Sequence, residues 1–274
     1  MDGKTIGFIG AGNMANCLIR GLLTRGMNSA SILAADVDAD KLQHLSTDCK
    51  ITAASNQQIA DSADVIVLAV KPQVIEAVCT DLQLAATSSP RLIVSIAAGI
   101  TIQHLQDWLG DSEAIVRCMP NTPALIGKGI SGLFANANVS ELQRRASEQL
   151  MDAVGVCVWV DQESDIDTVT AVSGSGPAYF FLFIEAMQEA AREMGLSEEV
   201  AKSLVYQTAV GAAELAISSE DAITELRRKV TSPGGTTERA INQFEEDGLR
   251  EIVKRALTAA RDRSIELASE IDKK

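Results

Sequence analysis

The chain has 274 residues, enough for two domains and a sizeable core, and its 46% hydrophobic and 22% charged residues are typical of a soluble globular protein. Its formal net charge of −13 argues against a nucleic-acid partner, which would need a basic face. No apolar run reaches the ~18 residues of a bilayer span, and the N-terminus MDGKT has no signal-peptide pattern, so we expect no membrane partner and a cytoplasmic location.

The first predicted element is a buried strand at 6–9 that stops at Gly10-Ala11-Gly12, where a helical pattern begins at once. A strand, a glycine turn and a helix N-terminus together form a phosphate-binding site, because free N–H groups and the helix dipole favour the charge of a pyrophosphate. Ala15 replaces the third glycine of the G-x-G-x-x-G fingerprint and is small enough for close helix–strand packing. The alternative is that these glycines serve packing alone.

The second predicted strand, 32–36, ends in Asp36, which lies 24 positions after Gly12. An acidic residue about 20 positions past the fingerprint commonly binds the ribose hydroxyls of NAD. The alternatives are that Asp36 begins a loop, or that Asp38 caps the following helix. Its place at a strand end favours the ribose interpretation.

Strands and helices continue to alternate along the first half of the chain. Buried strands are predicted at 64–70, 91–96 and 115–119, and shorter ones at 127–134 and 156–160; helices are predicted at 57–63, 73–85 and 141–153 and after Thr101. This alternation predicts a doubly wound parallel sheet. Lys71 follows one strand end and is a candidate phosphate or nicotinamide contact, or else a solvated lysine. The small residues Ala97-Ala98-Gly99 follow the strand 91–96 and would let a flat ring approach the end of that strand.

From about residue 165 the pattern is helical, with glycine-rich interruptions at 173–177 and 231–237. We expect both to be helix N-termini that offer N–H groups and hydroxyls to an anion such as a carboxylate; the alternative is that Ser175 or Thr236 is only an N-cap. The helix after Pro177 is apolar nearly all round, so we expect it to be largely buried. Helices are also predicted at 197–217, 220–230 and 249–271. Their apolar character indicates that two copies pack together, or else that they pack on the first domain.

Metal and triad chemistry find little support in the composition. The five cysteines are widely spaced with no C-x-x-C pair, which favours reduced thiols over disulfides or zinc ligands. His44 and His104 each lie in an amphipathic helical pattern, and we interpret both as surface or helix-face residues. We therefore predict no metal site and no Ser-His-Asp triad.

Motifs along essentially the whole chain resemble those of the pyrroline-5-carboxylate reductase family. In order they are GFIGAGNMA, AVKP at 69–72, SIAAG at 95–99, MPNTP at 119–123, SGSGPAY and SPGGTT, of which the last two are by far the most specific. The resemblance implies an α/β Rossmann-type doubly wound sheet, which we place at 1–162, followed by an all-α helical dimerisation domain at 163–274. It implies an oxidoreductase that uses NADPH or NADH to reduce the C=N bond of 1-pyrroline-5-carboxylate to L-proline, the last step of proline biosynthesis. A homodimer is the minimum assembly, and a ring of dimers is the larger alternative.

The resemblance also implies roles for single residues. The expected cofactor contacts are Ile9, Gly10, Ala11, Gly12, Asn13 and Met14 at the pyrophosphate, Asn56, Ala69, Val70, Lys71 and Pro72 along the ribose and nicotinamide, and Ser95, Ile96 and Ala97 at the nicotinamide. The expected substrate contacts are Ser175, Gly176, Gly234, Gly235 and Thr236, with Ser232 and Thr237 as the catalytic hydroxyls. Thr237 is expected to donate a hydrogen bond or relay a proton at the ring nitrogen. Glu163 and Glu220 lie where the family has acids in or near its site.

The chain departs from the family after the second strand. Many members carry a neutral-to-basic pair there that accepts the 2′-phosphate of NADPH, whereas this chain has Asp36-Val37. A carboxylate would repel that phosphate and bind a free 2′-hydroxyl, so we expect NADH to be used at least comparably well. One rival function is a 3-hydroxyacid dehydrogenase, but the stretch 176–195 lacks the lysine of those enzymes. Another is a non-catalytic nucleotide-binding regulator, which would have no need of a second anion pocket.

Overall fold

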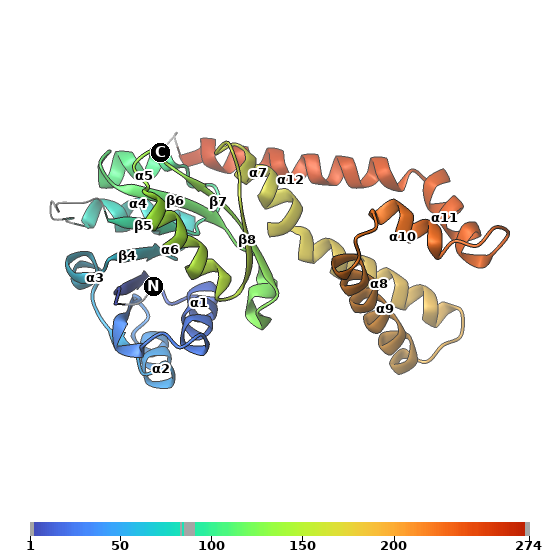
Figure 1. The fold of residues 1–274 in the computed structure, drawn as a ribbon, viewed down its shortest axis with the longest axis horizontal. Helices are drawn as coiled ribbons and strands as arrows, with labels where there is room; N and C mark the ends of the chain where they lie inside the picture. The colour runs from blue at the N-terminus through green and yellow to red at the C-terminus, as the bar shows by residue number, and fades with distance from the viewer. Residues whose placement is uncertain (1–2, 83, 85–90, 272–274) are drawn as a thin grey trace. The chain divides into compact units, whose positions relative to one another are not determined.

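The structure is a computed structural model that describes residues 3–82, 84 and 91–271 (Figure 1). It divides into two compact units. Unit 1 comprises Met1–Ser175 together with Ala260–Lys274, and unit 2 comprises Gly176–Ala259. The last helix, α12 (Leu249–Ile271), therefore contributes to both. This division by contacts differs from the boundary at 162/163 that the sequence suggested, and that boundary stays a prediction.

Unit 1 is built on a sheet with the strand order β3-β2-β1-β4-β5-β6-β7-β8. The strands are β1 (Ile6–Ile9), β2 (Ile32–Ala35), β3 (Thr52–Ala53), β4 (Val65–Leu68), β5 (Leu92–Ser95), β6 (Ala114–Met119), β7 (Gly129–Ala135) and β8 (Gly155–Trp159). Neighbouring strands pair in parallel, as predicted, except that β7 runs antiparallel to β6. The link between those two strands holds only the short helix η2 (Thr122–Ile126), too little chain for the crossover that a parallel pair requires.

Helices cover both faces of this sheet (Figure 1). One face carries α1 (Asn13–Thr24), α2 (Ala39–Cys49) and α6 (Glu141–Asp152), which pack on Phe8, Val67 and Val94. The other carries α3 (Asn56–Ser62), α4 (Pro72–Asp81) and α5 (Ile102–Leu109), which pack on Ile9, Ile66 and Ile93. Burial on both faces explains why the central strands are continuous apolar runs. The predicted helix 73–85 ends at Asp81; Ala85 lies outside the described residues.

Two further segments complete unit 1. The short helix α7 (Asp165–Val169) continues directly into one turn of π-helix, η3 (Thr170–Gly174), which leads to Ser175. The C-terminal part of α12 joins them through Ser264, whose hydroxyl donates to Asp167 Oδ1 at 2.7 Å. This buried bond connects positions 97 residues apart and joins α12 to α7.

Unit 2 consists of helices alone among its described residues. They are α8 (Gly176–Glu193), α9 (Glu198–Ser218), α10 (Ile223–Lys229), α11 (Thr236–Glu246) and the first part of α12, and α8 and α9 lie side by side as a hairpin (Figure 1). The expectation that α8 is largely buried is wrong for the single chain, because Phe180, Phe181 and Leu182 are 71%, 65% and 65% exposed. The chain does not itself cover this apolar helix. Within the described parts, no helix combines the length and the apolar character that a membrane span needs.

Candidate functional site

The glycine turn at the end of β1 is held between the two neighbouring strands. The Gly10 N–H donates to the Ala35 carbonyl at 2.8 Å, and the φ of Gly10, +98°, lies in the region that favours glycine. A Cβ atom on Gly10 would lie 2.7 Å from the Ala69 carbonyl oxygen and 3.0 Å from the Val70 side chain. The end of β4 therefore approaches the turn so closely that glycine alone fits there.

Gly12 is the N-cap of α1 and leaves the N-terminus of that helix open. It has no side chain to satisfy the first N–H groups, and the first turn of α1 holds no acidic residue. A Cβ atom on Gly12 would meet nothing closer than the Ala69 carbonyl oxygen at 4.0 Å, so there is space over the turn. Asn13 is exposed and Met14 half-buried beside it. Open N–H groups at a positive helix end fit a pyrophosphate, the group predicted for residues 9–14.

Asp36 lies beside this turn. Its Oδ2 accepts a hydrogen bond from the Ala11 N–H at 2.7 Å and lies 3.1 Å from Lys41 Nζ, while its Oδ1 accepts from the Asp38 N–H at 3.0 Å. Burial alone would raise the pKa of this carboxyl, but the three donors lower it below its ordinary value, so Asp36 is charged at neutral pH. The Ala11 N–H is thus used within the protein, and the N–H groups from Gly12 onward are those open to an anion.

Asp38, the alternative helix cap, does cap α2, since its Oδ1 accepts from the Lys41 N–H at 3.0 Å. The two sequence interpretations are therefore compatible: Asp36 faces the turn and Asp38 caps the helix. Sequence reasoning did not single out Lys41. The signal that could have found it is its position in the first turn of α2, five residues after Asp36.

The residues predicted beside the ribose and nicotinamide lie at the same end of the sheet. The register pairs Ile9 with Leu68 and Leu68 with Ser95, so the segments that follow β1, β4 and β5 leave one edge together. At the end of β4, Ala69 and Val70 are half-buried, and exposed Lys71 is the N-cap of α4 with Pro72 at its first position. Asn56 is half-buried at the start of α3.

The segment 95–97 at the end of β5 is largely buried. Ser95 is fully buried, and its Oγ accepts from the Ala97 N–H at 3.4 Å within the core. Ala97 is also buried, whereas Ile96 is half-buried. His104, interpreted as a surface or helix-face residue, turns inward: it is 7% exposed, and its Nδ1 accepts from the Thr101 N–H at 3.2 Å in the capping box of α5.

The loop SPGGTT in unit 2 forms an open helix N-terminus, as predicted. Gly235 is the N-cap of α11 without a side-chain cap, and its N–H donates to the Ser232 carbonyl at 3.0 Å. Ser232 and Thr236 are exposed and Thr237 is half-buried. The N–H of Gly234, whose φ is +69°, donates to Glu238 Oε2 at 2.8 Å. Sequence reasoning missed Glu238, although a glutamate in the first turn of a helix is the usual signal for such a bond.

The SGSGPAY segment does not form the free helix N-terminus that the sequence suggested. The Ser175 N–H donates to the Thr170 carbonyl at 2.8 Å, and the backbone enters α8 from the π-turn without leaving helical geometry. The glycine-rich composition signals a break in hydrogen-bond spacing, not a break in the helix. Ser175 is half-buried and Gly176 buried, and their roles toward the substrate stay predictions.

Glu163 belongs to a buried ion-pair network. Its Oε1 accepts from the Ile102 N–H at 2.7 Å and lies 3.1 Å from Arg117 Nη1, while Arg117 Nη2 lies 3.4 Å from Asp167 Oδ1. The Arg117 side chain, on β6, is only 4% exposed. These contacts give Glu163 a structural task that links α5 to the sheet. Glu220 is exposed.

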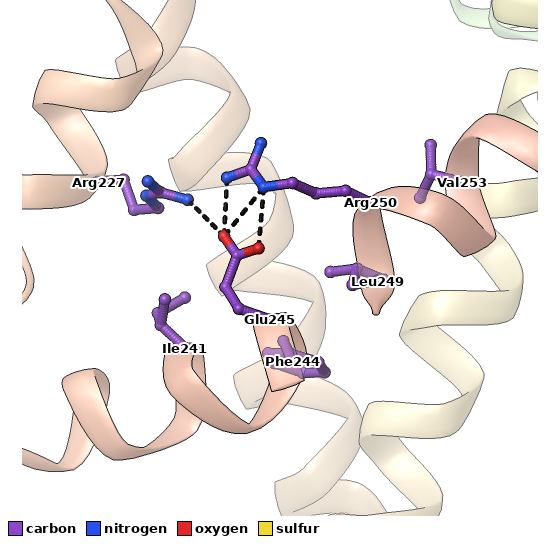
Figure 2. Close-up of a pocket in the computed structure, with 7 residues that line it drawn as sticks. All are labelled: Arg227, Ile241, Phe244, Glu245, Leu249, Arg250 and Val253. Atoms are coloured by element: carbon purple, nitrogen blue, oxygen red, sulfur yellow. Dashed lines mark hydrogen bonds and ion pairs between the residues drawn. The ribbon is translucent and has the colours of Figure 1, made fainter. Parts of the chain in front are cut away.

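A cavity of about 440 Å³ in unit 2 differs from the candidate site in its lining (Figure 2). Arg227 on α10 and Arg250 on α12 both point to Glu245 on α11, at 3.2 Å and 2.7 Å. Its remaining lining is apolar: Ile241, Phe244, Leu249 and Val253. Its one carboxylate is paired twice, and these partly exposed ion pairs connect α11 to α10 and α12. Within the described ranges, no three acidic, Cys or His side chains gather as a metal ion would need.

Two family models match the chain. Residues 163–267 match the model for pyrroline-5-carboxylate reductase dimerisation, and residues 5–99 match a model described as NADP oxidoreductase, coenzyme F420-dependent. The first contains the SGSGPAY and SPGGTT segments, and the second contains the glycine turn and Asp36.

Full-length relatives agree with these matches. The chain is 51% identical over 272 residues to the pyrroline-5-carboxylate reductase of Pseudomonas aeruginosa, covering 99% of both chains. Its fold superposes on the structure of a pyrroline-5-carboxylate reductase from Coxiella burnetii with a TM-score of 0.93 at 44% identity, covering 97% of this chain and 98% of that one. It also superposes on a Plasmodium falciparum pyrroline carboxylate reductase with NADP bound, with a TM-score of 0.85 at 30% identity, covering 98% and 99%.

Proposed function

The chain belongs to the pyrroline-5-carboxylate reductase family, and from that premise we propose that it reduces the C=N bond of 1-pyrroline-5-carboxylate to L-proline, the last step of proline biosynthesis. The observation that carries the proposal is that the chain has two open helix N-termini of different character. One, at Gly12, opens at the carboxyl edge of a Rossmann-type sheet; the other, at Gly235, is bordered by hydroxyls. The first suits a dinucleotide and the second a small carboxylate.

We assign the dinucleotide cofactor to the carboxyl edge of the sheet. A bound reduced nicotinamide supplies the hydride. The N–H groups from Gly12 to Met14 hold the pyrophosphate, Asp36 accepts from the ribose, and the segments 69–72 and 95–97 border the nicotinamide half. The charged Asp36 carboxylate disfavours a 2′-phosphate, which supports use of NADH at least comparable with that of NADPH.

We assign the imine substrate to the loop 231–237. The N–H groups at the start of α11 hold the carboxylate of the imine, with Gly234, Gly235 and Thr236 around it. Ser232 and Thr237 supply hydroxyls, and Thr237 relays the proton that the ring nitrogen takes up when the imine becomes electrophilic. The bond from Gly234 to Glu238 keeps the loop in shape. Since the electrophile is a protonated imine and the product nitrogen is basic, positioning is the main demand on the protein, and no strong acid–base pair is required.

Assembly and location complete the proposal. The dimerisation family model and the exposed apolar surface of α8 support a homodimer, with a ring of dimers as the larger alternative. We also propose a cytoplasmic location and the domain boundary at 162/163, where the dimerisation model begins.

Turnover tests the function directly. NADH and NADPH oxidation at 340 nm is followed in parallel with 1-pyrroline-5-carboxylate as substrate. Oxidation that depends on the imine is expected with both, and its absence with both cofactors would contradict the proposal. Thr237→Ala is expected to lower kcat/KM for the imine by roughly tenfold to a hundredfold, as removal of one positioned donor does. The matched variant Thr237→Ser keeps the hydroxyl and should retain most activity. Equal activity of Thr237→Ala and Thr237→Ser would show that the hydroxyl has no role in the reaction.

A further inference from the structure

The three donors to the Asp36 carboxylate differ in how freely they move. The N–H groups of Ala11 and Asp38 are part of the backbone, at 2.7 Å and 3.0 Å. The third donor is Lys41 Nζ, at 3.1 Å from Oδ2, on a flexible side chain that is 42% exposed, whereas the Asp36 side chain is 11% exposed. Lys41 can therefore turn away while the two backbone bonds keep the carboxylate in place.

The charges around this carboxylate are unfavourable to a second anion. Asp38 caps α2, and Asp40 stands in the first turn of the same helix. The segment 36–41 thus holds three carboxylates and one ammonium, and that ammonium pairs with Asp36. A phosphate on a ribose beside Asp36 would meet like charge, unless this ammonium turned to it.

We propose that Lys41 determines how well this chain accepts a 2′-phosphorylated cofactor. Its ammonium pairs with Asp36 when the ribose carries a 2′-hydroxyl, and with the phosphate when the ribose carries a 2′-phosphate. The inference rests on the proposed function, in which Asp36 binds the ribose. The chain could then bind either cofactor with the same backbone geometry, and only the Lys41 side chain would change its partner. Arginine or lysine after the second strand is not required, because the cation comes from the first turn of α2.

Binding to the substrate-free enzyme tests this without turnover. The Kd of NADPH and of NADH is measured by calorimetry for the wild-type chain and for Lys41→Gln. The ratio of the NADPH Kd to the NADH Kd is expected to rise about tenfold in Lys41→Gln, the usual loss for one charge-assisted bond to phosphate. Lys41→Arg should keep the wild-type ratio. The difference in this ratio between wild type and Lys41→Gln should shrink at high salt, since the pair is partly exposed.

The matched control is Lys50→Gln. It removes the same charge at the other end of α2, roughly 14 Å away along a helix that rises about 1.5 Å per residue, and should leave the ratio unchanged. A ratio that stays the same in Lys41→Gln, or shifts equally in Lys50→Gln, overturns the proposal. Failure of the proposed function is separate: it would appear as cofactor binding with no imine-dependent oxidation, whatever the ratio of the two Kd values.

Discussion

Asp36 Oδ2 lies 2.7 Å from the backbone nitrogen of Ala11, so the acid that follows β2 holds the glycine turn that follows β1. One carboxylate thereby joins two parts of a dinucleotide site that are 25 residues apart. Its orientation depends on the same bond that shapes the turn. Changes at Asp36 should therefore affect both cofactor choice and stability, and the two effects can be measured separately.

Cofactor choice is the first test of Asp36. Asp36→Ser removes the charge that opposes a 2′-phosphate and keeps a small hydrogen-bonding side chain. The ratio of kcat/KM for NADPH to that for NADH is expected to rise about tenfold or more, because the charge that repels the 2′-phosphate is lost and the ribose hydroxyl loses its charged acceptor. Parallel 340 nm assays measure this ratio. A strong preference for NADPH in the wild-type chain that persists in Asp36→Ser would show that Asp36 is not at the ribose.

Stability against pH is the second test. The pKa of Asp36 is lowered in the folded chain: burial opposes the charge, but the bonds from Asp38, Ala11 and Lys41 outweigh it. A group with a lowered folded pKa stabilises the protein above its unfolded pKa of about 3.9, and this contribution is lost as the pH falls through the lower folded value.

Urea unfolding of wild type and Asp36→Asn measures this contribution. The variant is expected to be about 1 kcal/mol less stable at pH 7, and the difference should close as the pH falls below about 4. Asp40→Asn removes a nearby exposed charge and serves as the control. A difference for Asp36→Asn that is the same at both pH values would rule out the carboxylate as its source.

The sequence could predict the strands that position the site, because β1, β4 and β5 are buried on both faces and leave uninterrupted apolar runs. It could not predict β3, which has two exposed residues and no such run. Arg117 was missed for a related reason: its partners Glu163 and Asp167 lie 46 and 50 residues away, and periodicity holds no information on such pairs. The loop at 231–237 was predictable because its helix start is local, whereas the π-turn before Ser175 depends on hydrogen-bond spacing that composition does not encode.

Gly10 and Gly26 separate backbone strain from close approach. Both have a positive φ, of +98° and +90° respectively. A Cβ atom at Gly26 meets nothing within 4 Å, whereas at Gly10 it meets the Ala69 carbonyl at 2.7 Å. Gly26→Ala should cost about 1 kcal/mol of unfolding free energy from its dihedral angle alone. Gly10→Ala should cost several times more and weaken NADH binding about tenfold or more, since the turn must move. Equal costs in urea unfolding would show that β4 does not restrict the turn.

The apolar surface of α8 predicts the behaviour of the assembly. Leu182 on α8 is 65% exposed and Leu142 on α6 is 75% exposed in the single chain. If α8 packs on a second copy, Leu182→Asp places an unpaired charge in an apolar interface, and the dimer Kd should rise a hundredfold or more, about 3 kcal/mol. Light scattering across a dilution series measures this. Leu142→Asp makes the same change outside the dimerisation segment and should leave the mass unchanged; dissociation by both variants, or by neither, contradicts an interface on α8.

Among these substitutions of polar side chains, we expect the replacement of Arg117 to lower the free energy of unfolding most. Its side chain is 4% exposed, and its guanidinium pairs with the carboxylates of Glu163 and Asp167, so Arg117→Met leaves both without this cation. The expected cost is about 3–5 kcal/mol of unfolding free energy, because a buried charge that loses its partner keeps its desolvation penalty. Arg145→Met is the control: Arg145 pairs with Glu141 at a 66% exposed position and should lose less than about 0.5 kcal/mol.

The cause of that loss can be tested within the same network. If the loss comes from the unpaired carboxylates, adding Glu163→Gln and Asp167→Asn to Arg117→Met should recover part of it, since the amides carry no charge. The amide oxygen that Glu163→Gln introduces can still accept from the Ile102 N–H, and Ser264 can still donate to the side chain at position 167. A triple variant that is no more stable than Arg117→Met would mean that the guanidinium acts through packing and not through its charge. Since these carboxylates link α5, α7 and α12 to β6, the same urea titrations measure what this network contributes to the free energy of unfolding.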